Sequence, residues 1–459
     1  MKTFDLLPTD ENIISTLKSD LLRRNESIAH FVTLLDNIEG PFSIALDGKW
    51  GSGKTFFVKQ AKLVLDIYND ILEKYSSIDS KKIKEAVEKY NVAKEPPLIS
   101  LKQVTVYYDA WSNDNDIDPI LSIMSEILQS INSDFDFKAP VKTKDVFSAV
   151  IEFFTNRKIE SLLNSTEGED PFFKLKSHKD MQSLISEFLG SLLPEQGDRL
   201  VIFIDELDRC KPSYAVQLLE RIKHYFISDQ ITFVFSVNLT ELQHTIKQHY
   251  GNDFDAHRYV NRFFDMLISL PPAKTTNYFQ TLGLSDNNSY YQLICKEVIK
   301  TNKFELREIS KFAQIMKIMT PTNISNPLST RNKALDFSLH CVVPIMMGLL
   351  ISDITRYNLF IDGKDSSPLI EILTSPEIKR VLDHFFLEKD ETFGEPRYSN
   401  EIHVDNLKIL NEVYDALFVQ NYTGNVYSNT VGATDFSQYD RDQLFKVATM
   451  LSNFSNYNT

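Results

Sequence analysis

A short glycine-rich stretch, "GKWGSGKT", holds residues that could bind a phosphate chain. Its three glycines let consecutive backbone N–H groups turn inward around an anion. Lys54 follows Gly53 and would reach the β- and γ-phosphates, and the Thr55 hydroxyl would bind Mg²⁺. The spacing Gly48, four residues, Gly53, Lys54, Thr55 is that of a P-loop. The sequence therefore predicts a nucleotide site with Mg²⁺.

The elements on either side of this stretch are those that a P-loop requires. Residues 41–47, "PFSIALD", form a short apolar run typical of a strand, and residues 55–72 repeat apolar side chains at helical spacing. The helix N-terminus adds a favourable dipole for an anion. The residues expected to contact the nucleotide are Gly48, Trp50, Gly51, Ser52, Gly53, Lys54, Thr55 and Phe56.

A second motif, "RLVIFIDELDR", places acids at the end of an unbroken apolar run, residues 200–204. Such a run is typical of a parallel strand buried on both faces, whose carboxyl end borders the ligand crevice. We expect Asp205 to hold the Mg²⁺ shell and Glu206 to orient or deprotonate the attacking water, with Asp208 as the alternative base. Arg209 is expected to pair with a nearby carboxylate. We also expect this strand to neighbour the one that precedes the P-loop.

These motifs together resemble the KAP family of P-loop NTPases, which is related to the additional-strand ATPases and the signalling NTPases with numerous domains. The resemblance rests on "IALDGKWGSGKT", "VYYDAW", "VIFIDELDRCKPSYAVQLLERIK", "FVFSVNLTEL" and "RYVNRFFDMLISLP", in family order between Asn25 and Pro272. It implies an α/β fold in which helices flank a parallel sheet. It also implies Mg²⁺-dependent ATP hydrolysis that drives a conformational switch or assembly motor. The implied setting is phage exclusion or another defence system, often beside a separate effector.

Further site residues follow from this resemblance. Asn238, at the end of the apolar run "ITFVFSV", would contact the γ-phosphate or the attacking water, or would instead be a turn former. Arg262 resembles a basic position of the family, and Arg258 lies about one helical turn before it. Either arginine could act on its own site or on that of a neighbouring subunit. Arg307 opens a helix much as the lid arginine of related ATPases does.

The chain departs from family members that carry a membrane-spanning pair in the insert before the acidic strand. Here residues 145–164 are too short and too charged to span, and we expect an amphipathic helix packed on the core. We expect Trp111 to be buried under the nucleotide site. The apolar run at residues 339–351 is shorter than the roughly 20 residues of a spanning helix, and Pro344 should break it.

We predict two domains. Residues 1–275 form the P-loop core with helical insertions at about 70–104 and 113–197, and residues 276–459 form a helical lid and accessory helical domain. Polar links at residues 320–332 and 422–435 are predicted to be loops.

Composition restricts the partners. A net charge of −14 lacks the dense basic face that duplex nucleic acid requires, so nucleic-acid contact is allowed but not indicated. The three cysteines are far apart in sequence, and no signal peptide or membrane insertion is predicted, which favours a cytoplasmic protein. The expected partners are ATP and either a second copy of the chain or a separate effector protein.

Other functions remain open at this point. A nucleotide-binding scaffold could hold ATP without turnover and recruit a partner through its helical half, although the intact acids argue for hydrolysis. A small-molecule kinase is disfavoured because kinases of this fold seldom carry the paired-acid strand. ATP is favoured over GTP because "NKAL" at Asn332 lacks the acid that guanine recognition needs.

Overall fold

A computed structural model shows a chain that divides into two compact units, Leu6–Thr275 and Thr276–Thr459. The structure describes residues 7–69, 77–91, 97–116, 118–134, 148, 182–190, 193, 197–284, 289–319, 332–376, 378–386, 406–422 and 427–455. The predicted amphipathic helix at residues 145–164 and most of the link at 320–332 lie outside these ranges.

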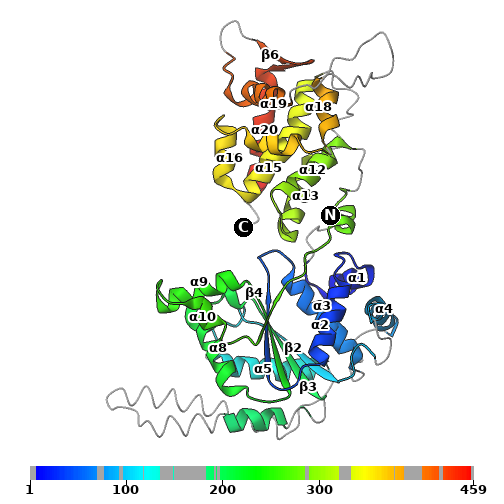
Figure 1. Cartoon of the computed structure of the whole chain (residues 1–459), viewed down its shortest axis with the longest axis vertical. Coiled ribbons are helices and arrows are strands. Elements are labelled where there is room, and N and C mark those ends of the chain that lie inside the picture. Colours follow the sequence, from blue (N-terminus) through cyan, green and yellow to red (C-terminus); the bar gives the residue numbers. More distant parts are fainter. Residues whose placement is uncertain are drawn as a thin grey trace. The chain divides into compact units, whose positions relative to one another are not determined.

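The first unit is built on a five-stranded parallel sheet with the strand order β2-β3-β4-β1-β5 (Figure 1). The predicted parallel sheet flanked by helices is therefore confirmed. β4 lies between β1 and β3, so the expectation that these two strands are neighbours is wrong. The strands are β1 Phe42–Asp47, β2 Gln103–Asp109, β3 Arg199–Asp205, β4 Ile231–Val237 and β5 Met266–Ser269.

The strand register aligns the chemically important ends of the sheet. Asp47 of β1 pairs with Val237 of β4, and Asp205 of β3 pairs with Ser236 of β4. Because all the strands run in one direction, the segments that follow β1, β3 and β4 leave the same edge of the sheet. This edge therefore brings together the glycine-rich loop, the acidic segment and Asn238.

Helices cover both faces of this sheet because its strands are apolar on both sides. Val201 and Phe203 of β3 face one cluster, and Leu200, Ile202 and Ile204 face the other. The first cluster is covered by α1 Asp10–Ser19, α2 Asn25–Asp36, α3 Lys54–Tyr68 and α4 Ser77–Glu88. The second is covered by α5 Pro119–Asp134, α8 Pro212–Tyr225, α9 Leu239–Tyr250 and α10 Ala256–Val260.

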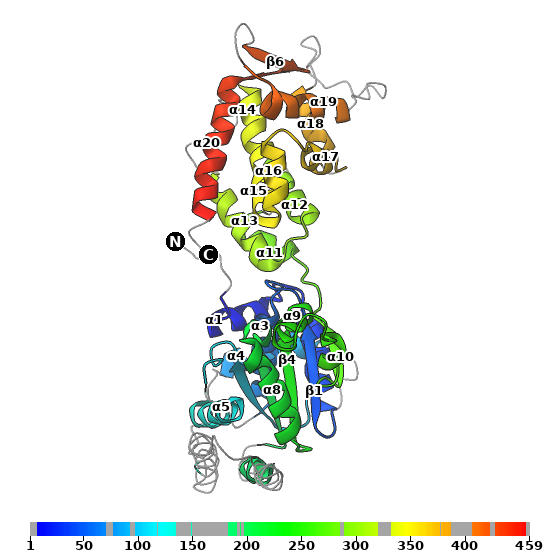
Figure 2. The same cartoon turned by 90° about the vertical axis from the view of Figure 1, so that its left-hand side faces the viewer.

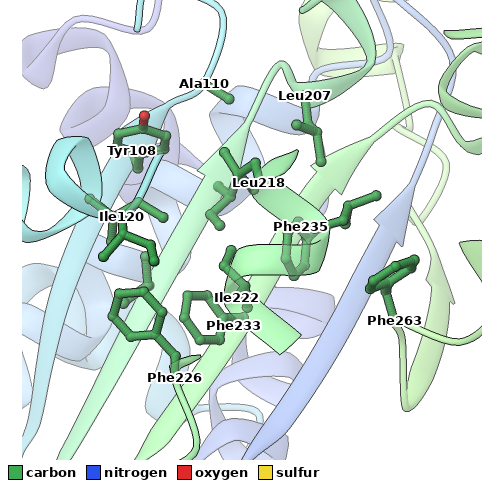
Figure 3. Close-up of a cluster of buried hydrophobic side chains, with 14 of the residues drawn as sticks. Tyr108, Ala110, Ile120, Leu207, Leu218, Ile222, Phe226, Phe233, Phe235 and Phe263 are labelled. Carbon is green, nitrogen blue, oxygen red and sulfur yellow. The ribbon is translucent and has the colours of Figure 1, made fainter. Parts of the chain in front are cut away.

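Aromatic side chains fill much of the second cluster (Figure 3). Phe226 and Phe233 meet edge to face with their ring centroids 5.5 Å apart, and Phe235 lies 5.1 Å from Phe264. Close packing of this kind resists movement of the backbone. This packing holds β3, and with it the acids at its end, in a fixed position.

In the residues that the structure describes, the second unit is helical apart from one hairpin (Figure 2). Its central helix, α15 Val343–Ser352, packs against α12, α13, α16, α17 and α20. The other helices are α11 Thr276–Thr281, α12 Tyr290–Thr301, α13 Leu306–Met319, α14 Lys333–Phe337, α16 Ile354–Ile361, α17 Ser367–Leu373, α18 Lys379–Phe386, α19 Asn406–Tyr414 and α20 Gln438–Ser455.

The hairpin corrects the prediction of a loop at residues 422–435. β6 Ser428–Val431 pairs antiparallel with β7 Thr434–Ser437, and Gly432 takes a positive φ of 54° in the turn. The two strands are short and mostly polar, so their sequence lacks the apolar alternation that would have indicated them.

The expectation that Pro344 breaks the apolar run is also wrong. Helical structure continues from Lys333 to Ser352, because a π-helical turn at Ser338–Val342 lies just before the proline. In that turn the Val343 N–H reaches the Ser338 carbonyl, and the wider turn accommodates the proline ring. This run of 20 residues is long and apolar enough to cross a membrane by length and composition. Its most apolar stretch of 18 residues has a mean hydropathy of 1.9, and 72% of that stretch is buried inside the structure.

Candidate nucleotide-binding site

The loop between β1 and α3 has a backbone that depends on glycine at three positions. Gly51 and Gly53 take positive φ values of 79° and 90°, which residues with a Cβ rarely adopt. A Cβ on Gly48 would lie 3.0 Å from Ser52 Oγ and 3.2 Å from Lys54 Cγ. The loop therefore folds back closely on itself at the N-terminus of α3, as phosphate binding requires.

Lys54 is held inside this loop. Its Nζ donates to the carbonyl oxygens of Gly48 and Lys49, at 2.6 and 3.2 Å. Burial lowers the pKa of Lys54, although the nearby carboxylates of Asp208 and Asp205 oppose that effect. The ammonium thus lies at the loop and within electrostatic range of the acids that follow β3.

Thr55 and Asp205 are in direct contact. The Thr55 hydroxyl donates to Asp205 Oδ2 at 2.7 Å, and Asp205 is only 1% exposed. Neighbouring oxygens around an octahedral Mg²⁺ lie roughly 3 Å apart. A hydroxyl and a carboxylate in this arrangement fit two adjacent positions of a magnesium shell.

Two further donors fix the Asp205 carboxylate. The Tyr107 hydroxyl of β2 donates to Oδ2 at 2.9 Å, and the Glu206 N–H donates to Oδ1 at 3.0 Å. Burial and the neighbouring Asp205 raise the pKa of Tyr107 far above its ordinary value, so its hydroxyl stays protonated and remains a donor. No role for Tyr107 was predicted from the sequence. Side chains alternate between the two faces of β2, and this alternation could have indicated that Tyr107 and Tyr108 face opposite sides of the sheet.

Glu206 has an unusual backbone and an unusual acidity. Its φ of 59° is rare for a residue with a side chain, and strain of this kind is common at functional sites. Burial, reinforced by the charge of Asp205, raises the pKa of Glu206 to about 7. A carboxyl that exchanges its proton near neutral pH is suited to general base catalysis.

Arg209 pairs with a carboxylate, and the carboxylate is that of Glu206. Its Nε lies 2.5 Å from Glu206 Oε2, one turn away in the short 3-10 helix Leu207–Arg209. Its guanidinium also lies over the rings of Trp50 and Trp111, at 5.9 and 5.6 Å from their centroids.

Both tryptophans are close to half exposed, 47% for Trp50 and 52% for Trp111. The expectation that Trp111 is buried under the site is therefore wrong, because its ring lies at the surface and stacks on Arg209. The indole Nε1 of Trp50 donates to Asp208 Oδ2 at 2.6 Å. Asp208 thus holds a residue of the glycine-rich loop.

The remaining loop residues have structural contacts. Ser52 Oγ donates to the Lys49 carbonyl at 2.7 Å, and the Phe56 side chain is buried in the first apolar cluster. Arg24, which sequence analysis missed, donates from Nη1 to the Ser52 carbonyl at 3.1 Å and is 4% exposed. The buried Arg24 side chain thereby stabilises the backbone of the loop.

Asn238 caps α9. Its Oδ1 accepts from the backbone N–H groups of Thr240 and Glu241, at 3.2 and 3.4 Å. The preceding residue, Val237, accepts the Gly48 N–H at 3.1 Å, so Asn238 stands beside the start of the loop. The capping contact matches the turn-former alternative, and contact with a phosphate stays a prediction.

The predicted arginines all come after β4 in the chain. Arg258 and Arg262 are exposed and precede β5, which runs parallel to β1. The helix that holds Arg258, α10, packs against α9, where Gln243 Nε2 lies 3.4 Å from His257 Nδ1. Contact of either arginine with a phosphate stays a prediction. Arg307 is exposed near the start of α13 in the second unit, and its role stays a prediction.

A parallel sheet with this strand order, a phosphate loop after β1 and an acidic end on β3 defines a P-loop NTPase core. The chain belongs to the KAP family: a family model described as the KAP family P-loop domain matches residues 24–325. No curated protein matches the chain. Among solved structures it is similar to one titled "Structure of C. elegans PCH-2", at 11% identity and a TM-score of 0.20, over 82% of this chain and 71% of that one.

Proposed function

We propose that this chain binds ATP with Mg²⁺ and hydrolyses it, and that the cycle works as a conformational switch or assembly motor. The observation that supports this most directly is the contact between the Thr55 hydroxyl and the Asp205 carboxylate. These oxygen ligands come from two distant motifs and meet beside Lys54. KAP membership supports nucleotide binding in general.

Each group at the site has a distinct task in this proposal. Backbone N–H groups of residues 48–55 bind the phosphates, and Lys54 exchanges its carbonyl contacts for phosphate oxygens. Thr55 and Asp205 hold Mg²⁺, which neutralises phosphate charge when bound. Glu206 accepts a proton from the attacking water.

The remaining predicted residues complete the cycle. Asn238 stands at the edge of the sheet where the γ-phosphate would lie. Arg262, or its neighbour Arg258, supplies a cation to the site of a second copy; both side chains are exposed and could reach a neighbouring chain. Arg307 links the helical unit to nucleotide state.

The proposed setting is a cytoplasmic defence system against phage, in which the chain associates with itself or with a separate effector protein. This part of the proposal rests on the family resemblance. ATPase assays with candidate activators, including DNA, RNA and effector proteins, would identify the trigger.

The direct test is an assay of phosphate release from Mg·ATP, combined with a measurement of ATP binding. Lys54→Ala should lose both binding and turnover. Glu206→Gln should bind ATP and fail to release phosphate, because it keeps the site's shape without the base. Lys223→Ala, at an exposed lysine of α8, is the matched control and should behave as wild type. Turnover that persists in Lys54→Ala and Glu206→Gln would reject this site.

One observation favours the alternative, a scaffold that binds ATP without turnover. The Glu206 carboxylate is already engaged by Arg209 in this structure. A chain that binds Mg·ATP tightly and releases no phosphate, with every candidate activator present, would be a scaffold. Phosphate release that is abolished by Glu206→Gln would exclude that reading.

A further inference from the structure

The Arg209 guanidinium is held by groups from three separate segments. Trp50 belongs to the glycine-rich loop, Trp111 follows β2, and Glu206 follows β3. Its side chain is 23% exposed, so most of it is enclosed by these neighbours. A planar guanidinium stacks well on indole rings and bonds strongly to a carboxylate.

Contacts that do not involve Arg209 hold the Trp50 ring and the turn that carries Trp111. The Trp50 ring is anchored through its N–H to Asp208. Trp111 lies in a turn stabilised by Asp109, whose Oδ1 accepts the Ser112 N–H at 3.0 Å and whose carbonyl accepts the Asn113 side-chain amide at 2.8 Å.

The ion pair opposes the task proposed for Glu206. A general base must direct a carboxylate oxygen at the water it activates. Here Oε2 lies 2.5 Å from Arg209 Nε, in a charge-assisted hydrogen bond that directs it at the arginine. Movement of the guanidinium out of the stack would release that oxygen.

We propose that Arg209 is a positioning residue that restrains Glu206, and that the stack with Trp50 and Trp111 sets the strength of this restraint. The inference rests on the proposed hydrolysis of ATP. The free chain is then a slow ATPase, and whatever displaces Arg209 from between the two rings accelerates it. The half-exposed faces of the tryptophans make the stack accessible from outside.

The test compares steady-state ATP turnover in wild type, Arg209→Gln and Trp111→Ala. With a partly exposed ion pair of this strength, roughly five chains have Glu206 restrained by Arg209 for each chain in which Glu206 is released. Arg209→Gln should therefore raise kcat about sixfold, with KM for ATP within about twofold of wild type. Trp111→Ala should change kcat in the same direction, and Trp111→Phe, which keeps a ring over the guanidinium, should stay near wild type. The double variant Arg209→Gln/Trp111→Ala should be no faster than Arg209→Gln.

Arg221 provides a matched control. It also forms an ion pair, with Asp118 at 3.3 Å, and lies over an aromatic ring, Tyr225, at 5.6 Å. It stands on α8 and does not contact Glu206, so Arg221→Gln should leave kcat unchanged.

A second measurement reports the stack without any turnover. Trp50 and Trp111 are the only two tryptophans of the chain, so its indole fluorescence comes entirely from this stack. Arg209→Gln should increase quenching by acrylamide, and Arg221→Gln should not.

The outcomes separate the two proposals. Unchanged or lower kcat in Arg209→Gln, in a chain whose turnover is abolished by Glu206→Gln, would overturn the restraint and leave the ATPase intact. Unchanged quenching in Arg209→Gln would show that the arginine is not enclosed by the rings, which also overturns it. If neither wild type nor any variant binds or hydrolyses ATP, the proposed function itself is rejected.

Discussion

The Thr55 hydroxyl donates a 2.7 Å hydrogen bond to the Asp205 carboxylate across 150 residues of sequence. The contact joins the N-terminus of α3 to the end of β3, although β4 lies between β1 and β3 in the sheet. The glycine-rich loop must therefore reach past one strand to meet the acid. The 2.7 Å between the Thr55 hydroxyl and Asp205 Oδ2 is short enough for both oxygens to bind one Mg²⁺.

Replacing Thr55 tests this contact. Thr55→Val keeps the shape of the side chain and removes its oxygen. It should raise the Mg²⁺ concentration needed for half-maximal ATP turnover by about 10- to 100-fold. Thr55→Ser keeps the hydroxyl and should stay close to wild type. Titration of activity with Mg²⁺ at fixed ATP measures the effect, and equal midpoints for valine and serine would contradict it.

Tyr107 and Tyr108 form a natural pair of test and control. Tyr107→Phe removes a donor from the buried Asp205 carboxylate, and should lower Mg²⁺ affinity about tenfold and stability by about 1–2 kcal/mol. Tyr108 faces the other side of β2, where its hydroxyl bonds to Ser122 and Tyr214. Tyr108→Phe should therefore reduce stability only. A similar loss of Mg²⁺ affinity in both variants would show that the effect is one of folding.

The proposed action of Arg262 on a second copy can be tested by mixing subunits. Arg262→Ala should bind ATP and lose turnover by roughly a thousandfold, the effect of losing a transition-state arginine. Addition of Glu206→Gln chains should restore part of the activity, because they carry the missing arginine. Arg258→Ala, treated in the same way, decides between the two arginines. No recovery on mixing, for either arginine, would argue against action between subunits.

The second unit should show a specific sensitivity to acid. Asp336 accepts hydrogen bonds from Tyr290 at 2.8 Å and from His340 Nδ1 at 2.5 Å. Burial alone would raise the pKa of Asp336, but these two bonds outweigh it and hold the pKa below its ordinary 3.8. A carboxyl with a depressed pKa in the folded state contributes stability above its unfolded pKa, and the contribution is lost as pH falls through the folded value.

Asp336→Asn should therefore lower stability by about 1–2 kcal/mol at pH 7, and the difference from wild type should vanish well below pH 3.8. Thermal unfolding at several pH values measures this. Asp362→Asn, at an aspartate that is half exposed, is the control and should show little effect at any pH. A difference that persists unchanged in strong acid would mean that the charge of Asp336 is not its source.

The sequence was most informative where chemistry restricts residue type. A glycine-rich loop between an apolar strand and a helix, and acids after a buried strand, were enough to predict a parallel α/β core and to select Lys54, Thr55 and Asp205 as one site. The spacing could not reveal that β4 separates the two strands, because strand order depends on which helices pack on each face.

Contacts across the sheet were also hidden. The role of Tyr107 depends on which face of β2 it occupies. Trp111 lies at the surface against Arg209, a cation of the 3-10 helix that follows β3. The prediction that Pro344 breaks the helix was wrong because the π-helical turn before it has no clear sequence signature. The polar hairpin at β6 and β7 lacked the apolar alternation by which strands are recognised.

The position of Lys54 has a consequence for ligand selectivity. Its ammonium already has two carbonyl partners within the loop, so an entering ligand must replace contacts that are present from the start. A single phosphate exchanges these contacts for a similar number of new ones and gains little. A chain of phosphates offers several oxygens and more negative charge to the same ammonium. On the proposed function, this arrangement of Lys54 alone would favour a nucleoside triphosphate over inorganic phosphate.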